Sequence, residues 1–315
     1  MAFVRWLYLM KSKVMFPGYG GFRTVGRWVC AATVVVGSLV VQPVGAEELL
    51  SDAEVARILA SHKGKASEVS EPRKVVLCWS PPDHPAGTHA YELLAKDYAE
   101  RLSSIRAITA TAVKDFPTEA QWSDADLVVF NLTVQAWSDE QFAMVDRHLA
   151  RGGSLMVVHQ GLVQRKGYDR WADRIGFAFS WGKGGARSKW GQGSLTVQLD
   201  NDHELFKGFP QKIAVKDELY WNLQKGTRGT ITVLGQTPAP NIGSNGKVAR
   251  WPAFWVVEHP PVTAAKGGRV FCSVIGHHQS LQEDAFFRLM MARATAWCLR
   301  EPVAAFGPLT KTDSP

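Results

Sequence analysis

The sequence predicts an α/β fold in which a mainly parallel sheet lies between two layers of helices and carries a β-rich insertion. Short runs that are apolar on both faces recur from residue 73, and amphipathic stretches of helical length separate them. This alternation is typical of parallel strands covered by helices. After residue 159 the regular alternation gives way to Gly-, Trp- and Lys-rich segments with shorter strand candidates, which indicates the insertion.

The chain before this domain divides into two parts. Residues 1–46 contain five basic residues and no acidic residue, then a 13-residue apolar run (29–41), Pro43 and Val44-Gly45-Ala46. This order predicts a signal peptide cleaved after Ala46 and export to the periplasm or beyond. The run is shorter than the roughly 20 residues that span a bilayer, so no stable span is expected after cleavage, and an uncleaved anchor is the alternative. Residues 47–72 predict a lead-in helix (51–62) and a linker.

Removing the leader changes what the charge and the cysteines imply. The net charge falls from +7 to +2, because five of the 36 basic residues lie in the leader. The basic balance is therefore a targeting feature, and no nucleic-acid partner is expected. Three cysteines remain, at apolar positions of predicted strands or a helix, so we expect buried free thiols rather than disulfides: Cys78, Cys272 and Cys298.

The elements of the predicted domain, residues 73–303, follow in order. The first strands are 74–79, 105–113, 127–132 and 154–159, with helices 89–102 (capped by Thr88), 139–151 and 168–175. Shorter strands are expected at 195–199, 213–215, 230–234 and 253–258. Strand 269–275 and helix 283–299 close the domain, and residues 304–315 are expected to form a flexible tail.

Polar residues gather where three predicted strands end. Asp83, His84, His89 and Glu92 follow strand 74–79, His159 ends strand 154–159, and His277 follows strand 269–275. Ligands bind at the carboxyl ends of strands in open parallel sheets, so these histidines are expected to share a site. Turn or capping roles are the alternative for each histidine alone.

Two of these positions suggest particular chemistry. His89 and Glu92 are spaced i, i+3 at a predicted helix start, so Glu92 could orient His89 or transfer a proton, or only compensate the helix dipole. His159 occupies the sharp strand-to-turn junction that holds a nucleophile in related folds. Neither Ser nor Cys is present there, which argues against acyl transfer and leaves a base, an acid or a metal ligand.

The remaining signals concern cofactors and substrate binding. No G-x-G-x-x-G or phosphate-loop spacing occurs, so no nucleotide cofactor is expected, whereas a divalent metal held by loop histidines stays open. Asp217-Glu218-Leu219-Tyr220-Trp221 could supply one carboxylate to a site or form a solvated bend. Tryptophans suited to stacking on sugar rings, or to core packing, are Trp181, Trp190, Trp221, Trp251 and Trp255.

Five motifs in order resemble the trehalose-utilisation (ThuA-like) family. They are D-H-x-x-G-x-H-x-Y-E (83–92), G-G-S-L-M-V-V-H (152–159), D-N-D-H-E-L-F-K-G-F (200–209), D-E-L-Y (217–220) and G-G-R-V-F-C-S-V-I-G-H (267–277). The resemblance implies a flavodoxin-like, class I glutamine amidotransferase-like three-layer sandwich. His159 would then stand where the amidotransferase cysteine lies, so glutaminase activity is not implied.

The resemblance also implies a role in carbohydrate metabolism, with keto-sugars or disaccharides made by partner oxidoreductases. The candidate catalytic residues are His84, His89, Glu92, His159 and His277, and the candidate substrate-binding residues are Asp217, Glu218, Tyr220, Trp255 and Arg269. The sequence departs from the family pattern at His278, where an acid is usual, and in the basic, Trp-containing stretch 184–193.

Three functions are compatible with the sequence. The first is an exported enzyme that acts on a sugar or glycoside by acid–base or metal-assisted chemistry. The second is a non-catalytic carbohydrate-binding module that uses the same pocket. The third is a structural or partner-binding domain in which the histidines are incidental.

Overall fold

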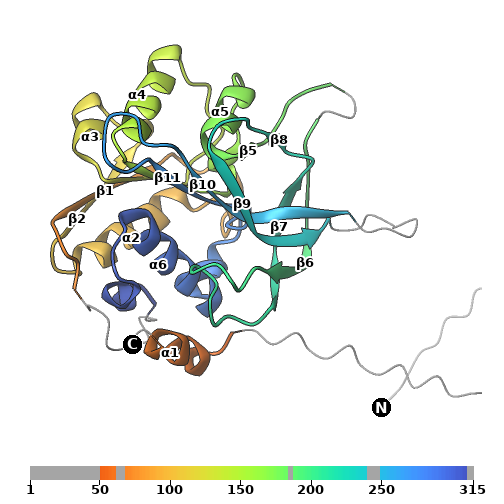
Figure 1. The fold of residues 1–315 in the computed structure, drawn as a ribbon. Coiled ribbons are helices and arrows are strands. Elements are labelled where there is room, and N and C mark those ends of the chain that lie inside the picture. Colours follow the sequence, from red (N-terminus) through yellow and green to blue (C-terminus); the bar gives the residue numbers. More distant parts are fainter. Residues whose placement is uncertain (1–49, 62–67, 184–186, 240–248, 311–315) are drawn as a thin grey trace, which may run out of the picture. The chain divides into compact units, whose positions relative to one another are not determined.

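A nine-stranded mixed sheet forms the centre of the fold (Figure 1). The computed structural model describes residues 50–61, 68–183, 187–239 and 249–310. The predicted signal peptide lies outside the described residues. Among the helices that the structure describes, none is both long and apolar enough to cross a bilayer.

Five parallel strands form one half of the sheet, in the order β2-β1-β3-β4-β11. Their chain order is 2-1-3-4-5, the flavodoxin-like arrangement, which confirms the predicted fold class. Apolar side chains on both strand faces explain this arrangement, since each of these strands except β2 is buried at most of its positions. The bounds are β1 Arg73–Trp79, β2 Ile108–Lys114, β3 Leu127–Phe130, β4 Ser154–Val158 and β11 Arg269–Ser273.

Four antiparallel strands extend the sheet beyond β11, in the order β10-β9-β6-β7. They are β6 Lys189–Leu199, β7 Lys212–Trp221, β9 Thr230–Pro238 and β10 Arg250–Glu258, and β5 Phe177–Ala178 pairs with β8 Gln224–Lys225 in a small second sheet. Strands β6 and β7 are longer than predicted. The segment Asp217–Trp221 therefore lies inside a strand, and the alternative of a solvated bend is wrong.

Helices cover both faces of the parallel half. Helices α2 (Tyr91–Ser103) and α6 (Ala285–Leu299) lie on one face, and α3 (Glu119–Asp124), α4 (Asp139–Ala150) and α5 (Tyr168–Ile175) lie on the other (Figure 1). Capping boxes at Ser138 and Thr118 start α4 and α3, because each side chain accepts a hydrogen bond from the third backbone amide of its helix. The short helix α3 was not predicted.

Helix α2 begins two residues later than predicted. His89 has a left-handed backbone (φ 48°) and precedes the helix, whose N-cap residue is Ala90. Thr88 does not cap it, because the Thr88 hydroxyl donates to the carbonyl of Pro85 instead. The loop between β1 and α2 is thus a separate structure rather than a first helical turn.

The two ends of the described chain pack on α6. Helix α1 (Asp52–Ala60) begins with a capping box at Ser51 and contacts both α6 and the 3-10 segment η4 (Val303–Thr310). The prediction of a flexible tail is wrong over residues 304–310, because Phe306 and Leu309 are buried in the core.

Two further 3-10 segments are η1 (His159–Leu162) and η3 (Gln279–Glu283). The cysteines predicted as buried free thiols are Cys78, Cys272 and Cys298, and the structure confirms that state.

Candidate functional site

Sharp turns after three parallel strands direct three histidines to one point. His89 ends the loop after β1, His159 directly follows β4, and His277 follows β11. His89 and His159 both adopt left-handed backbone conformations (φ 48° each), and Gly276 before His277 has φ 146°. The amide of His89 donates to the carbonyl of His277 at 3.0 Å, which ties the first loop to the last.

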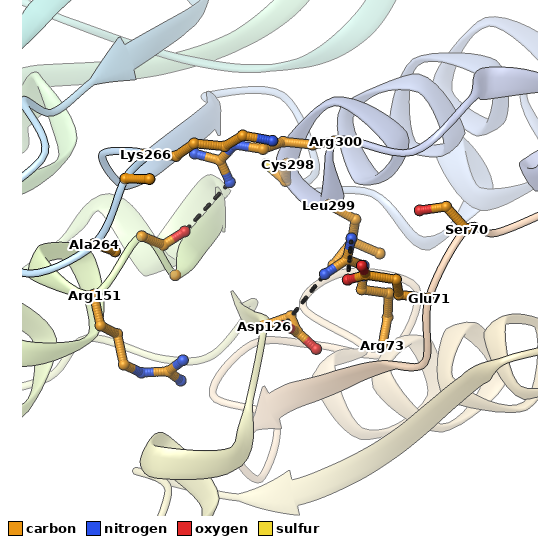
Figure 2. A pocket seen from close by; sticks show the side chains of 13 residues that line it. Ser70, Glu71, Arg73, Asp126, Arg151, Ala264, Lys266, Cys298, Leu299 and Arg300 are labelled. Atoms are coloured by element: carbon orange, nitrogen blue, oxygen red, sulfur yellow. Dashed lines mark hydrogen bonds and ion pairs between the residues drawn. The ribbon is translucent and has the colours of Figure 1, made fainter.

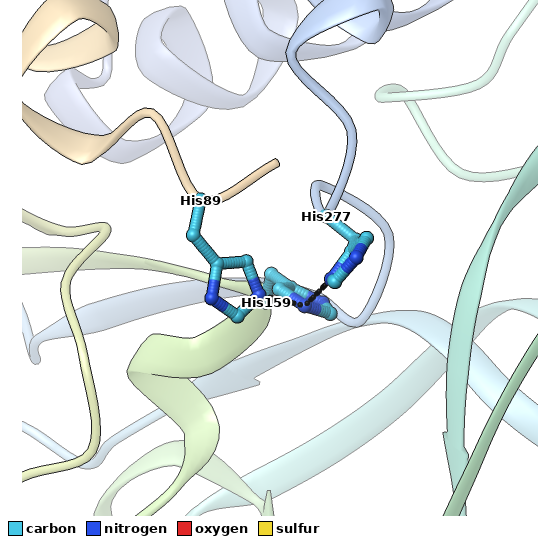
Figure 3. A group of neighbouring side chains, drawn as sticks. All are labelled: His89, His159 and His277. Atoms are coloured by element: carbon cyan, nitrogen blue, oxygen red, sulfur yellow. Dashed lines mark hydrogen bonds between the residues drawn. The ribbon is translucent and has the colours of Figure 1, made fainter. Parts of the chain in front are cut away.

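His89, His159 and His277, called here the histidine triad, are all buried and converge on one nitrogen (Figure 3). Nε2 of His159 lies 3.1 Å from Nε2 of His89 and 3.1 Å from Nδ1 of His277. The hydroxyl of Tyr220 lies 3.0 Å from the same nitrogen. Three polar atoms therefore surround one lone pair, which can accept only one proton at a time.

The outward-facing ring nitrogens fix the proton positions on two of these histidines. Nδ1 of His159 donates to the carbonyl of Val274 at 2.7 Å, so its Nε2 bears a lone pair in the neutral ring. Nδ1 of His89 lies 2.7 Å from the carboxylate of Asp83 and donates to it. Two lone pairs thus face each other across 3.1 Å when both rings are neutral, an arrangement that a shared cation would relieve.

Electrostatics keep two members of the triad, His159 and His277, uncharged. Burial lowers the pKa of His159 well below its usual value, and the neighbouring His89 lowers it further. Burial and the same neighbour lower the pKa of His277 to about 4. Neutral imidazoles are the form in which histidine binds a metal.

Asp83 organises the outer side of the triad. Its Oδ1 accepts from His89, lies 2.9 Å from Nδ1 of His84, and accepts from the hydroxyl of Tyr91 at 3.2 Å; its Oδ2 accepts from the hydroxyl of Thr133. Burial raises the pKa of Asp83, but the hydrogen bonds from His89, Thr133 and His84 outweigh it and hold the pKa below its usual range. Asp83 is therefore an ionised carboxylate that orients two imidazoles.

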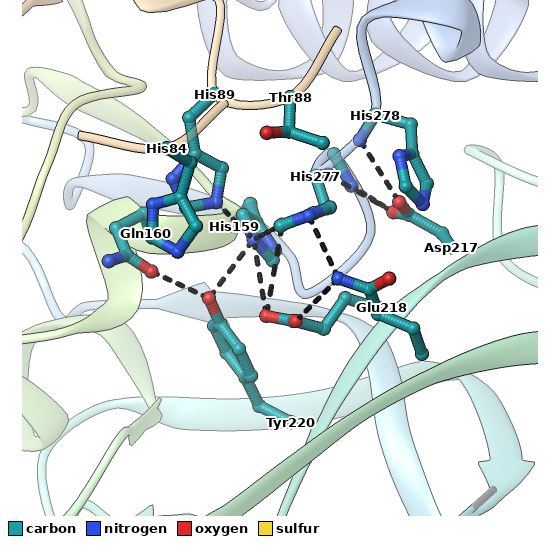
Figure 4. A network of polar contacts seen from close by, with 12 residues as sticks. His84, Thr88, His89, His159, Gln160, Asp217, Glu218, Tyr220, His277 and His278 are labelled. Atoms are coloured by element: carbon teal, nitrogen blue, oxygen red, sulfur yellow. Dashed lines mark hydrogen bonds and ion pairs between the residues drawn. The ribbon is translucent and has the colours of Figure 1, made fainter. Parts of the chain in front are cut away.

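Strand β7 supplies the other side of the site (Figure 4). Asp217 accepts from the backbone amides of Gly276, His277 and His278 at 2.6, 3.2 and 3.1 Å and so holds the turn that presents His277. Burial raises the pKa of Asp217 to about 7, although those amides lower it in part. Both carboxylates of this segment serve the site, whereas only one was predicted to enter it.

Glu218 and Tyr220 border the triad directly. Oε1 of Glu218 lies 3.6 Å from Nε2 of His159 and 3.9 Å from Nδ1 of His277. Burial raises the pKa of Glu218. The hydroxyl of Tyr220 donates to Oε1 of Gln160 at 2.7 Å, and burial with the nearby Glu218 raises its pKa well above the usual value.

A cavity of about 250 Å³ opens beside the triad. The β6–β7 hairpin forms one wall, because Trp190 pairs with Tyr220 and Gln192 pairs with Glu218 across the two strands. All four of these residues line the cavity, as do His84, His277, Gln160 and the aromatic residues Phe179 and Trp181. The cavity thus joins the buried triad to solvent.

Three predicted site residues lie elsewhere. The side chain of Glu92 is 44 % exposed and pairs with Lys96 at 2.6 Å, because His89 is not part of the helix and the two residues do not share a face. The indole of Trp255 is buried and donates to the carbonyl of Ile175 at 2.5 Å. Arg269 begins β11, at the opposite end from His277, and donates to the carbonyl of Trp297 at 2.8 Å.

The structure adds three residues that the predicted site lacked. Asp83 was recognised only as a loop residue, and its place six residues before His89 was the available signal. Gln160 follows His159 directly. Gln192 gave no signal in the sequence, because its role depends on the register of the β6–β7 hairpin.

A second hollow, of about 450 Å³, lies at the amino ends of the parallel strands (Figure 2). Arg73 in its lining lies 3.7 Å from Glu71, 3.8 Å from Asp126 and 2.6 Å from the buried Glu301 beside the hollow. Arg151 and Arg300 donate to backbone carbonyls. The arginines here are used in holding the fold, so the histidine triad is the better candidate for chemistry.

The triad has the geometry of a metal site. With metal–nitrogen bonds of about 2.1 Å, neighbouring ligand atoms lie about 3.0 to 3.4 Å apart for octahedral and tetrahedral angles. The two 3.1 Å nitrogen–nitrogen distances fall in this range, and all three candidate ligand atoms lie within 4.8 Å of one another. Asp83 behind His89 and the Val274 carbonyl behind His159 are the outer partners that metal-binding histidines require.

Comparisons with known proteins agree with this architecture. A family model described as "Trehalose utilisation" (ThuA) matches residues 75–298. A putative ThuA-like protein from Bacteroides uniformis has 13 % sequence identity over 78 % of this chain and 99 % of its own, with a TM-score of 0.55. One from Parabacteroides merdae has 16 % identity over 73 % of this chain and 90 % of its own, with a TM-score of 0.53. Among curated proteins, none matches the chain.

Proposed function

The chain belongs to the trehalose-utilisation (ThuA) family, and from this premise we propose that it is an enzyme acting on a glycoside or disaccharide, keto forms included. The family points to carbohydrate metabolism. The observation that carries the enzymatic proposal is the convergence of three buried imidazoles beside an open cavity. Ionisable groups with displaced pKa values in a cleft are the arrangement expected of an active site.

The chain's own residues fit a divalent cation. His89, His159 and His277 would hold it through Nε2, Nε2 and Nδ1, and Glu218 lies close enough to be a fourth ligand or to border it. Such a cation, when bound, would supply Lewis-acid polarisation of a substrate oxygen. Imidazole ligands suit Zn²⁺, Ni²⁺ and Fe²⁺, so the metal is to be identified by measurement.

Two groups on β7 are placed to handle protons at the cavity. Burial favours the protonated form of Glu218, so its carboxyl group can give a proton to a ligand oxygen and take it back. The hydroxyl of Tyr220 keeps its proton at neutral pH and serves as a hydrogen-bond donor. Gln160 and Gln192 can both donate to and accept from hydroxyl groups.

We further propose that the protein is exported and works beside a sugar oxidoreductase that supplies keto-sugars. The support for export is the acid-free, basic leader with its apolar run and small residues before position 47. The support for the oxidoreductase is the family resemblance alone.

Turnover by triad variants tests the enzymatic proposal. The purified protein would be incubated with plain and keto disaccharides, with and without Zn²⁺, Mn²⁺ or Ni²⁺, and products identified by mass spectrometry. We expect His159→Ala and His277→Ala each to abolish turnover, and His203→Ala, outside the site, to retain it. Unchanged turnover in both triad variants would refute the proposal.

A carbohydrate-binding module without catalysis is the second candidate. The exposed indoles of Trp181 and Trp190 at the cavity favour it, because such rings bind sugars without chemistry. Sugar binding by the wild type, with no product from any substrate or metal in the panel, would favour this function over the first.

A further inference from the structure

The wall of the cavity beside the triad has an aromatic part and a polar part. Trp181 packs on Phe179 (5.1 Å between ring centroids), and Phe179 packs on Tyr220 (5.3 Å). Tyr220 in turn stacks on His159 at 4.8 Å. A continuous row of rings therefore runs from the mouth of the cavity to the triad.

Trp190 completes this wall at the mouth. It lies directly opposite Tyr220 across the β6–β7 pair and remains 63 % exposed, while Trp181 remains 41 % exposed. Both line the cavity, so their exposed surface faces a space that a ligand can fill. Large exposed indoles around a concave site are typical of a binding surface rather than of packing.

The polar part of the lining presents groups that both donate and accept hydrogen bonds. Gln192 lies two residues from Trp190 on the same face of β6, and its amide contacts Oε2 of Glu218 at 3.3 Å and Nε2 of His277 at 3.1 Å. Gln160 borders the same space. Amides suit hydroxyl groups, which likewise both donate and accept.

The charge of the lining selects against anions. Among the described residues that line the cavity, none is Arg or Lys, and Glu218 contributes a carboxyl group. A phosphorylated or carboxylated ligand would therefore meet no Arg or Lys side chain of the lining and would lie beside an acid, with Arg187 over the ring of Trp181 as the nearby guanidinium. The volume of about 250 Å³ is slightly below the usual range of ligand pockets, which is enough for one sugar ring but not two.

Resting on the proposed function, we propose that this cavity is the subsite for one uncharged pyranose ring, held by its apolar face on Trp190. The ring's hydroxyl groups would meet Gln160 and Gln192, and the rest of the glycoside would leave through the mouth beside Trp181. The β6–β7 hairpin is thus the specificity element of the site, and neutral glycosides rather than sugar phosphates are its ligands.

Binding, measured without turnover, tests the subsite. The probes are trehalose, sucrose, maltose, cellobiose and trehalose 6-phosphate, with affinities from calorimetry and contacts from saturation-transfer NMR. For the tightest neutral sugar, we expect Trp190→Ala to raise Kd about tenfold or more, the equivalent of about 1.4 kcal/mol. Trp190→Phe, which keeps a ring, should stay within about threefold. Val262→Ala, an exposed apolar residue outside the cavity, should bind as the wild type does.

The outcomes separate this inference from the proposed function. Strong saturation of one ring only, with weaker binding of trehalose 6-phosphate, supports the subsite. Equal affinity of Trp190→Ala and wild type, preference for the phosphate, or no binding of any neutral sugar refutes it. If Trp190→Ala turns substrate over with unchanged KM, the subsite is refuted and the enzymatic proposal stands. If binding depends on Trp190 but no substrate is turned over, the subsite stands and the enzymatic proposal is refuted.

Discussion

Metal binding by the histidine triad is the prediction that the geometry defines most sharply. Nε2 of His89 lies 3.1 Å from Nε2 of His159, closer than two neutral rings with facing lone pairs would choose. A divalent cation at this point would bind the folded protein and not the unfolded chain. At a free metal concentration 100 times Kd, it would stabilise the fold by about 2.7 kcal/mol.

That stabilisation converts into a measurable melting shift. For a domain of about 150 to 250 residues, 1 kcal/mol moves Tm by roughly 2 to 4 °C, so the metal should raise Tm by about 5 to 10 °C. In His159→Gln the central ligand is lost. If Kd rises about 100-fold, the same metal concentration gives about 0.4 kcal/mol, and the shift falls to about 1 °C.

The assay is differential scanning fluorimetry of the metal-free protein with Zn²⁺, Ni²⁺ or Mn²⁺ added, alongside elemental analysis of the purified protein. His148→Gln is the matched control, because His148 of α4 is about as deeply buried as His159 but its ring contacts the Ser154 carbonyl of β4, outside the triad. Each variant is compared with its own metal-free Tm. Equal metal-induced Tm shifts in His159→Gln and wild type, or no stoichiometric metal under any condition, would refute metal binding by the triad. The three rings would then only share protons through hydrogen bonds.

Three further predictions concern residues around the site and in the core. Asp83→Asn should weaken metal binding about 10- to 100-fold in competition with a chromophoric chelator, since Asp83 orients a ligand, with Asp97→Asn as the control; a loss below threefold would contradict this role. His148 has a pKa lowered to about 4 by burial, so the unfolded chain takes up its proton first as the pH falls and stability is lost between about pH 6.5 and 4. Over that window, the free energy of unfolding of His148→Gln, measured with urea, should fall by about 3 kcal/mol less than that of the wild type. If the free energies of both proteins fall in parallel with pH, the lowered pKa of His148 is refuted. Glu92→Ala should leave metal binding and turnover unchanged, because the side chain pairs with Lys96 outside the cavity, and loss of either would restore Glu92 to the site.

The parallel half of the fold could be predicted because its strands are apolar on both faces. Only a sheet covered on both sides buries such a strand, which is why β3 and β4 were found with errors of no more than two residues at either end. The start of α2 could not be predicted in the same way. His89 sits in a left-handed conformation that the loop imposes, and helical spacing from His89 to Glu92 then has no meaning.

The convergence of the histidines could be predicted from strand ends, whereas contacts that depend on register could not. The histidines after β1, β4 and β11 converge because parallel strands bring their carboxyl ends to one edge. Gln192 reaches the site only because it pairs with Glu218 across β6 and β7, and a shift of one residue would turn it to the other face. The full length of β6 was not predicted, so this pairing could not be inferred.

The backbone around the triad also favours function over packing alone. His89 and His159 both occupy the left-handed region, which costs a non-glycine residue about 1 kcal/mol or more. Glycine or asparagine would adopt the left-handed backbone of those turns at lower cost. An apolar side chain would fill the interior without the second penalty, that of two lone pairs facing each other. The fold bears both penalties at two strand ends that meet on one nitrogen. A cation bound there would offset the second penalty, whereas packing offsets neither, so the arrangement is better explained by a bound ligand than by stability.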